Sequence, residues 1–317
     1  MAETLIGIKN VSKVFSSQKA DTRAVDRVSL RIRRGETLGL VGESGSGKST
    51  VGRLVARLIR PSSGKIVYRG KDISRLSERQ FRAYRKDIQI VFQNPNTALD
   101  PKRSVRELIT EPLMIHRIVP RSEIDGEIVR LLDMVGLSTA AMAKMPREFS
   151  GGEKQRICIA RALAVRPRFL FLDEPVSSLD VSVQSKILNL LEELKQALDL
   201  TYLFVAHGLN VVRHISDRVA VMYLGQIQEI GETEELYENP RHPYTQALVS
   251  AFPEPELTAR RTRIVLKGEI PSGAEEIRGC VFHNRCPYAR ELCRNKAPDL
   301  AIRGGRMIRC HGTGERI

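Results

Sequence analysis

Long apolar runs are missing from this 317-residue chain, and their absence limits what the protein can be. No stretch approaches the ~18–20 consecutive apolar residues that a membrane-spanning helix requires. The opening residues MAETLIGIKN also lack the basic and then apolar arrangement of a secretory signal. We therefore expect a cytosolic protein whose contact with any membrane is peripheral.

Internal repeats and low-complexity tracts are absent as well. With 42% hydrophobic and 28% charged residues, the composition is typical of a globular protein rather than of a disordered or fibrous one. The length suffices for one large domain, or for a main domain with an appendage.

Negative charge is in deficit, because 51 Lys and Arg residues face 37 Asp and Glu residues and leave a net charge of +14. Such an excess attracts phosphate groups, nucleic acid or an anionic membrane surface, although a solvated basic surface explains it equally well. No zinc finger, aromatic-interleaved basic patch or basic helix accompanies the charge. We therefore do not expect a nucleic-acid partner.

The apolar segments alternate between strand-like and helical patterns. Strand-like segments rich in Val, Ile and Leu fall at residues 5–15, 26–33, 36–41, 65–69, 87–92, 169–173, 202–206 and 219–224. Helical patterns occupy much of residues 98–148 and recur at 183–198. This alternation predicts an α/β fold with a mainly parallel sheet and a helical insertion. After about Phe252 the periodicity fades, which indicates a small separate appendage.

The strongest motif is GESGSGKS at residues 42–49, which follows an apolar strand and precedes a helical segment. This is the pattern of a phosphate-binding loop in its strand–loop–helix context. Its glycines let backbone N–H groups surround phosphates, and the amino end of the helix adds positive potential. We expect Lys48 to reach the β- and γ-phosphates of a nucleotide and the Ser49 hydroxyl to bind Mg²⁺.

A buried strand at residues 169–173 ends in Asp173 and is followed by Glu174. An α/β sheet places its catalytic groups at the carboxyl ends of its strands. Downstream of a phosphate-binding loop, this pattern predicts that Asp173 holds Mg²⁺ and that Glu174 polarises the attacking water.

The sequence FSGGE at residues 149–153 opens an amphipathic helix. Ser150 followed by Glu153 matches a capping box, which is an ordinary helix start. A capped helix that begins with glycines is also an anion site, so both interpretations can hold. Cys158, on the apolar face of this helix, is expected to lie in the core.

A Ser-Gly-Gly sequence between a phosphate-binding loop and an Asp-Glu strand resembles the signature of ATP-binding-cassette (ABC) ATPases. Further family marks follow in order: Gln93 after the strand QIVF, the sequence SSLD that ends at Asp180, and His207 after YLFVA. The resemblance implies a P-loop NTPase fold, with a mainly parallel core sheet, an antiparallel β subdomain and a helical signature subdomain. It implies an ATPase domain at residues 1–252, with the helical subdomain at about 96–165, and an extension at 253–317.

The same resemblance assigns roles to individual residues. Catalysis falls to Glu174, His207 and Lys48. Phe15 resembles the aromatic residue that stacks on adenine, and its alternative role is that of a core strand residue. The full set of expected nucleotide-binding residues is Phe15, Gly42, Ser44, Gly45, Gly47, Lys48, Ser49, Thr50, Gln93, Asp173, Ser150, Gly151, Gly152 and Asp180. The expected Mg²⁺ ligands are Ser49, Gln93 and Asp173.

Within the family, the chain is similar to the ATPases of oligopeptide and dipeptide importers. The similarity rests on QNPNTALDPKRSV (93–105), EPL (111–113), HPYT (242–245) and a cysteine-bearing tail. The stretch after Gln93 resembles the second of the two paired ATPases in such systems.

Three positions depart from the common family pattern. Glu153 replaces Gln at the end of the signature, Ser178 replaces Ala, and Gly208 follows the family histidine where Asp is frequent. Glu153 would place a carboxylate near the γ-phosphate, where like charge repels. None of the departures removes an expected catalytic residue, so we expect ATP hydrolysis.

Four of the five cysteines gather near the carboxyl end: Cys280, Cys286, Cys293 and Cys310. In a cytosolic chain such a group favours metal binding over disulfides. Four thiolates suit either a 4Fe–4S cluster or tetrahedral zinc, and the paired CxxC knuckles of a zinc ribbon are absent. Similar peptide-importer ATPases carry a 4Fe–4S cluster here, which favours that assignment, with zinc and unliganded thiols as alternatives.

The resemblance implies an ATP-hydrolysing subunit that energises peptide import, with ATP, Mg²⁺ and a 4Fe–4S cluster as cofactors. It implies a peripheral protein on the cytoplasmic face of the inner membrane. Its partners would be a second ABC ATPase subunit (another chain, or a second copy), two transmembrane permease subunits and, indirectly, an extracellular substrate-binding protein. The alternatives are a soluble ABC ATPase acting on nucleic acid or the ribosome, an importer of nickel chelates or glycosides, and a non-hydrolytic regulatory subunit.

Overall fold

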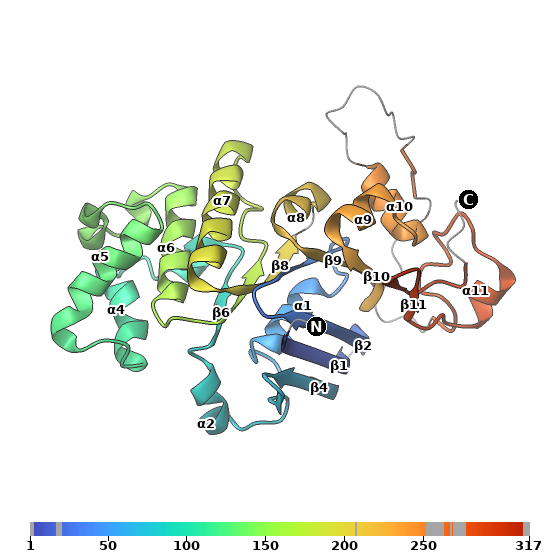
Figure 1. The fold of residues 1–317 in the computed structure, drawn as a ribbon, viewed down its shortest axis with the longest axis horizontal. Coiled ribbons are helices and arrows are strands. Elements are labelled where there is room, and N and C mark those ends of the chain that lie inside the picture. The colour runs from blue at the N-terminus through green and yellow to red at the C-terminus, as the bar shows by residue number, and fades with distance from the viewer. Residues whose placement is uncertain are drawn as a thin grey trace. The chain divides into compact units, whose positions relative to one another are not determined.

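Segments from distant parts of the chain assemble into two units (Figure 1). The first comprises Glu3 and residues 33–36 and 75–205, and the second comprises residues 4–32, 37–74 and 206–317. The structure is a computed structural model that describes residues 3–16, 21–206, 208–251, 263–266, 268 and 277–312.

The first unit is built on three parallel strands. β6 (Ile88–Val91), β7 (Phe169–Asp173) and β8 (Thr201–Ala206) lie in the order β8-β7-β6. Every residue of β7 is buried, as expected for a parallel strand that is covered on both faces. The sheet therefore brings Asp173, at the carboxyl end of β7, to the same edge as the end of β6.

Helices make up most of the remaining first unit. They are α2 (Glu78–Phe81), α3 (Pro95–Ala98), α4 (Val105–Ile115), α5 (Ile124–Met134), α6 (Gly151–Leu163) and α7 (Val181–Leu198), with short 3-10 turns at Arg82–Tyr84, Arg121–Glu123, Thr139–Ala143 and Pro146–Glu148. α6 packs against α3, α4, α5 and α7. Cys158 of α6 is 3% exposed, which confirms the prediction that it is a core residue.

The second unit contains a mixed sheet. β3 (Thr37–Val41) pairs in parallel with β9 (Arg218–Tyr223), and β10 (Gln226–Glu232) pairs antiparallel with β9. The extension continues this sheet, because β12 (Arg306–Ile308) pairs antiparallel with β10 and with β11 (Ala301–Arg303). The cysteine-bearing segment thus adds strands to the sheet that carries the phosphate-binding loop.

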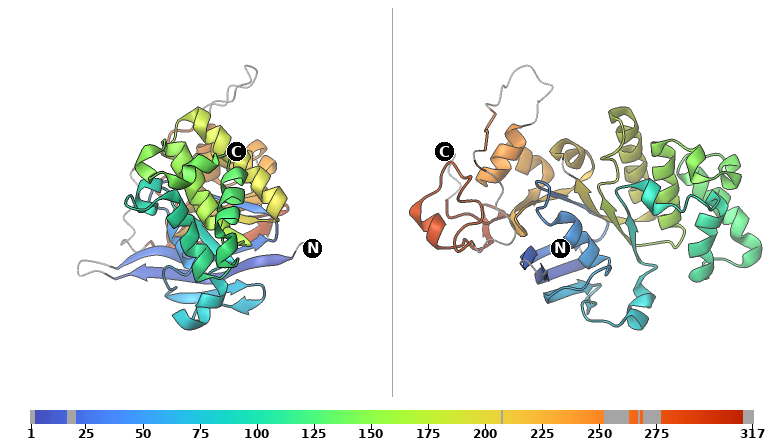
Figure 2. Two further views of the ribbon diagram at one scale, coloured as in Figure 1. Left: turned by 90° about the vertical axis from the view of Figure 1, so that its left-hand side faces the viewer. Right: turned by 180° about the vertical axis from the view of Figure 1, so that it is seen from behind.

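A separate sheet in the second unit has the order β2-β1-β4-β5. Its strands are β1 (Thr4–Phe15), β2 (Thr22–Arg33), β4 (Ser63–Tyr68) and β5 (Lys71–Asp72). In Figure 2 the two long blue strands, β1 and β2, run side by side. β4 pairs antiparallel with both β1 and β5, which confirms the antiparallel β subdomain that the family resemblance implied.

The helices of the second unit are α1 (Lys48–Val55), α8 (Leu209–Ile215), α9 (Thr233–Glu238), α10 (Pro243–Ser250) and α11 (Glu291–Asn295). α8 packs on β3, and α9 packs on β9 and β10. Within the described part of the chain, no helix has the length and apolar character that crossing a membrane requires.

The predicted strand segments all correspond to strands of the structure, with ends that differ by a few residues. The helical patterns at 98–148 and 183–198 correspond to α4, α5 and α7. β5, β10, β11 and β12 were not predicted. β10 is polar in sequence because it contains Gln226, Gln228 and Glu229. All of its residues are nevertheless buried except the last, Glu232.

Candidate functional site

The phosphate-binding loop joins β3 to α1 in the second unit. Gly42 and Gly47 have φ angles of 154° and 101°, a region that L side chains rarely adopt. A Cβ at Gly42 would lie 2.1 Å from the Met222 carbonyl oxygen, and one at Gly47 would lie 2.2 Å from that of Ala24. β9 and β2 therefore enclose the loop so closely that only glycine fits at both positions.

Lys48, the first residue of α1, folds back onto the loop. Its Nζ donates to the carbonyl oxygens of Gly42 at 2.7 Å and Glu43 at 2.9 Å, and the residue is 4% exposed. The residue at the N-cap of α1 is Gly47, so no side-chain hydrogen bond caps the start of this helix. A cation beside the amino end of a helix is an anion-binding arrangement.

The other loop positions expected to bind nucleotide lie nearer the surface. Ser44 and Gly45 are exposed, whereas Ser49 and Thr50 are half-buried on the first turn of α1. Phe15, at the end of β1, is 43% exposed, and the Lys13 ammonium lies 4.9 Å from its ring centroid. The Phe15 ring is thus outside the core, which removes the alternative of a core strand residue.

In the first unit, Gln93 and Glu174 meet at the carboxyl ends of two paired strands. Gln93 follows β6, and its Nε2 donates to Glu174 Oε2 at 2.8 Å. Glu174 is 5% exposed and has a φ of 50°, while its N–H donates to the Val205 carbonyl at 3.0 Å. A left-handed backbone at a non-glycine residue costs of order 1–3 kcal/mol and is concentrated at functional sites. Asp173 beside it is 3% exposed.

The FSGGE sequence forms the predicted capping box at the start of α6. Glu153 N–H donates to Ser150 Oγ at 3.3 Å, and Glu153 Oε2 accepts from Ser150 N–H at 2.8 Å and from its hydroxyl at 2.7 Å. These bonds from Ser150 lower the pKa of the Glu153 carboxyl. The Ser150 hydroxyl proton is thus directed to a carboxylate of its own helix.

The two signature glycines have different surroundings. A Cβ at Gly152 would lie 2.5 Å from Val183 Cγ1 of α7, so glycine is needed there for close packing of α6 on α7. Gly151 is exposed, and a Cβ there would lie 3.2 Å from the Leu179 side chain.

Asp180, expected to bind nucleotide, caps α7 in the structure. Its carboxylate accepts from Val183 N–H at 3.0 Å and from the Ser182 hydroxyl at 2.7 Å. The bond from Ser182 contributes most to the lowered pKa of Asp180. The expected catalytic residue His207 lies outside the described residues.

Three contacts of the loop were not foreseen, because they join residues far apart in sequence. The Tyr244 hydroxyl accepts from Glu43 N–H at 2.9 Å, and the Arg285 guanidinium pairs with the Glu43 carboxylate at 2.6 Å. Gly225 N–H donates to the Ser46 carbonyl at 3.0 Å. One signal in the sequence pointed to the first of these contacts, because Tyr244 belongs to the HPYT motif that the sequence analysis singled out.

His242, which opens that motif, caps α10. Its imidazole Nδ1 accepts from Tyr244 N–H at 3.1 Å, and its backbone N–H donates to the Glu229 carboxylate at 2.9 Å. Complete burial lowers the pKa of His242 to about 3. The imidazole is therefore neutral and structural, and it fixes the start of the helix that carries Tyr244.

The four clustered cysteines line one cavity of about 130 Å³, together with His242, His283 and His311. All five cysteines of the chain are free thiols. Burial contributes most to raising the pKa of Cys280 and of Cys286 to about 11, and the neighbouring cysteines act in the same direction. Across the described residues, no three His, Cys, Asp or Glu side chains are arranged as a ready metal site. The donor type suits a metal, but the thiols are not arranged as a preformed ligand set.

Comparison with known proteins adds an independent finding. Residues 25–177 match the family model described as "ABC transporter", and residues 228–293 match the one described as "Oligopeptide/dipeptide transporter, C-terminal region". The chain is 47% identical over 320 residues to the oligopeptide transport ATP-binding protein AppF of Bacillus subtilis, covering 98% of this chain and 97% of that protein. It is 42% identical over 301 residues to the di/tripeptide transport ATP-binding protein DppF of Pseudomonas aeruginosa, covering 95% and 93%.

Solved structures show the same similarity. The cassette CbiO1 from Clostridium perfringens, described as part of an ABC transporter complex, gives a TM-score of 0.67 at 28% identity, over 74% of this chain and 91% of that one. The ATP-binding cassette MJ0796, solved as a dimer bound to ADP and Pi, gives 0.66 at 29% identity, over 72% and 98%.

Proposed function

Since the chain belongs to the ABC ATPases of oligopeptide/dipeptide transporters, we propose that it hydrolyses ATP to drive the import of peptides through a membrane permease. The observation that carries the proposal is the phosphate-binding loop with Lys48 folded onto it. The 47% identity to an oligopeptide transport protein over nearly the whole chain supports peptides as the cargo. Nucleic-acid binding, ribosome binding and transport of nickel chelates or glycosides gain no support from these relatives.

In this proposal the loop and α1 bind the phosphates of ATP. Lys48 exchanges its carbonyl acceptors for phosphate oxygens, and the amino end of α1 adds positive potential. The proposed phosphate contacts of the loop are Gly42, Ser44, Gly45 and Gly47, and those of α1 include Ser49 and Thr50. The exposed Phe15 ring is proposed to stack on adenine.

Ser49, Gln93 and Asp173 are the proposed ligands of Mg²⁺, which would neutralise phosphate charge. Glu174 would accept a proton from the attacking water, and Gln93 holds its carboxylate in place. His207 keeps its expected role as a γ-phosphate contact.

The remaining half of each ATP site is proposed to come from a paired ATPase subunit. The γ-phosphate bound by one subunit would be contacted by the signature residues of the other, Ser150, Gly151 and Gly152. Asp180, which follows the Asp-Glu strand in sequence, remains a proposed nucleotide-binding residue. A different ATPase chain is the proposed partner, and a second copy is the alternative. Two permease subunits and, indirectly, an extracellular binding protein would complete a transporter in which this chain is peripheral on the cytoplasmic face of the inner membrane.

A metal centre in the extension is a further part of the proposal. Four thiols on one cavity, with several arginines nearby in sequence to offset thiolate charge, support a 4Fe–4S cluster, with zinc as the alternative. Because the thiols are not a preformed set, metal binding would have to draw them together. Anaerobic purification followed by iron, sulfide and zinc analysis tests this. Stoichiometric zinc without iron would decide against the cluster.

The test of the main proposal is ATP turnover by the assembled transporter. Glu174→Gln is expected to reduce turnover by about 10²–10⁴-fold while nucleotide binding survives. Lys48→Ala is expected to weaken nucleotide binding itself. Wild-type turnover in the Glu174→Gln variant would refute the assigned mechanism.

A further inference from the structure

The second residue of the phosphate-binding loop is held by the cysteine-bearing extension. The Arg285 guanidinium donates to both carboxylate oxygens of Glu43, at 2.6 and 3.1 Å, although the two residues are 242 positions apart in sequence. The side chains are 8% and 27% exposed. A bidentate pair fixes the orientation of the carboxylate as well as its distance. Arg285 directly precedes Cys286, so the contact starts beside the cysteine cavity.

Each polar group of Glu43 has a partner within the same unit. While Arg285 binds the carboxylate, the Tyr244 hydroxyl accepts from the Glu43 N–H at 2.9 Å. The Glu43 carbonyl accepts from Lys48 Nζ at 2.9 Å. Glu43 therefore links the extension to the lysine that is proposed to bind phosphate.

An aromatic cluster supports this arrangement. The ring centroids of Tyr223 and Tyr244 lie 4.8 Å apart, and each lies 5.3 Å from that of Phe282 in the extension. The Arg285 guanidinium stands 5.8 Å from the Tyr223 centroid. Packing of this kind limits the positions open to Arg285, so the guanidinium is preorganised for Glu43.

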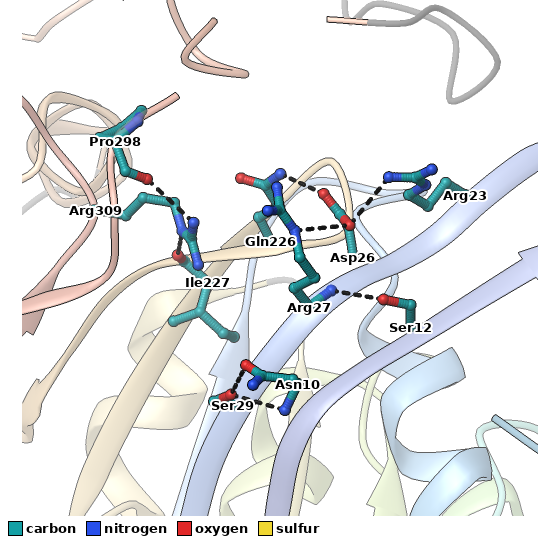
Figure 3. Close-up of polar contacts among 10 residues, drawn as sticks. All are labelled: Asn10, Ser12, Arg23, Asp26, Arg27, Ser29, Gln226, Ile227, Pro298 and Arg309. Atoms are coloured by element: carbon teal, nitrogen blue, oxygen red, sulfur yellow. Dashed lines mark hydrogen bonds and ion pairs between the residues drawn. The ribbon is translucent and has the colours of Figure 1, made fainter. Parts of the chain in front are cut away.

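The extension is also attached at a place that does not involve the loop (Figure 3). Arg309, which precedes Cys310, donates to the carbonyl oxygens of Ile227 at 3.0 Å and Pro298 at 3.2 Å. Figure 3 shows the neighbouring Gln226 bound to Asp26 of β2, at 2.6 Å. Pro298 belongs to the extension itself, and the Gln226–Asp26 bond joins β10 to β2. The attachment that does not involve Arg285 therefore consists of the Arg309–Ile227 bond and the pairing of β12 with β10.

We propose that Arg285 is a positioning residue for nucleotide binding, which acts through Glu43 to hold the phosphate-binding loop in the shape that accepts a triphosphate. Arg285 also neutralises a carboxylate that would otherwise repel the phosphates. This inference rests on the proposed function, because it requires ATP as the ligand of the loop. It assigns to the extension an effect on the ATP site that is separate from any metal it binds.

The experiment measures ATP affinity by equilibrium titration of the full chain with ATP. Mg²⁺ is left out, so that ATP is bound but not hydrolysed. Arg285→Ala is expected to weaken ATP binding by about 5- to 150-fold, the range of a typical coupling between sites. Arg278→Ala, an exposed arginine of the same extension, is the matched control and is expected to leave affinity unchanged. Arg309→Ala tests the attachment that does not involve the loop, and its effect on ATP binding is expected to be the smaller one.

A double-mutant cycle separates positioning from general damage. Glu43→Gln removes the repelling charge, so the added effect of Arg285→Ala is expected to be several-fold smaller in the Glu43→Gln background than in the wild type. Arg285→Lys keeps the charge but not the bidentate geometry, so its ATP affinity is expected to lie between those of the wild type and of Arg285→Ala. If Arg285→Ala does not fold, the Lys variant and Glu43→Gln still complete the comparison.

A second readout follows from the reciprocity of binding linkage. If ATP binding depends on Arg285, then ATP slows hydrogen exchange in residues 280–293 of the wild type and does so less in Arg285→Lys. Unchanged ATP affinity in Arg285→Ala, with affinity lost in Lys48→Ala, would overturn this inference and leave the proposed function intact. Failure of the wild type to bind ATP would instead overturn both.

Discussion

Gln93 and Glu174 lie 81 positions apart in sequence and are joined by a 2.8 Å hydrogen bond from the amide of one to the carboxylate of the other. The bond connects the segment that follows β6 to the residue that follows β7. Since β6 and β7 pair in parallel, the bond exists because both strands end at the same edge. The segment after β6 thus helps to orient the carboxylate that is proposed to activate water.

Gln93→Ala is expected to lower the turnover number, because it removes a donor from the Glu174 carboxylate. A hydrogen bond to a charged group contributes about 1.5–3 kcal/mol, which corresponds to roughly 10–100-fold in rate. The measurement is ATP turnover at saturating ATP in the assembled transporter. Gln89→Ala, on the same strand but bonded to the Arg85 carbonyl, is the control. Equal losses in both variants would contradict the assigned role.

Glu153→Gln is expected to strengthen ATP-driven pairing of ATPase subunits by a few fold. The glutamine preserves the capping box but frees the Ser150 hydroxyl from a carboxylate and removes a charge that repels phosphate. ATP-dependent association, followed by sedimentation, measures the effect. Glu148→Gln is the matched control, because Glu148 accepts in the same way from Met145 N–H. Unchanged association would show that Glu153 does not face the nucleotide.

Two glycine-to-alanine changes are expected to have opposite signs. Gly152→Ala places a Cβ 2.5 Å from Val183 and should destabilise the protein by about 1–3 kcal/mol through overpacking of α6 on α7. Gly126→Ala in α5 meets nothing within 4 Å and should stabilise by about 0.5–1 kcal/mol, because alanine favours helix. Urea unfolding measures both. Stabilisation by Gly152→Ala would contradict the packing described.

Glu127 is expected to make stability sensitive to acid. Arg130 binds its carboxylate at 2.7 and 2.9 Å and holds the pKa of Glu127 below its ordinary value of 4.5. The stabilisation is therefore complete above pH 4.5 and is lost as the pH falls through the lowered pKa. Glu127→Gln should cost about 1–2 kcal/mol at pH 7.

Urea unfolding of that variant at several pH values checks the sign of the effect. Its deficit against the wild type should shrink as the pH falls below 4.5. Asp133→Asn, an exposed change on the same helix, serves as the control and should give a small difference at every pH. A Glu127→Gln deficit that grows in acid would contradict the assignment.

Local patterns were sufficient to predict the parts of the site that are built locally. The loop glycines, the capping box of Ser150 and Glu153 and the carboxylates after β7 each depend on residues a few positions apart, or on one strand and its end. Gly42 and Gly47 carry their own requirement for a left-handed backbone, which the loop pattern already contains.

Contacts between distant segments could not be predicted in the same way. Arg285 gave no sign that it reaches Glu43, because the two residues lie 242 positions apart and meet only through tertiary packing, which includes the contact of Phe282 with Tyr223. β10 escaped prediction for a related reason. Glu229 in it is fully buried but accepts from His242 N–H and Arg306, two partners that lie elsewhere in the chain.

β12 also covers an edge. β10 pairs with β9 on one side, and on the other side its residues Glu229 and Ile230 pair with Ile308 and Met307 of β12. A cassette that stopped short of the extension would present the β10 edge to any other strand in solution, which is a common start of aggregation. The extension thus covers the middle of a strand edge that would otherwise be open to the addition of another strand.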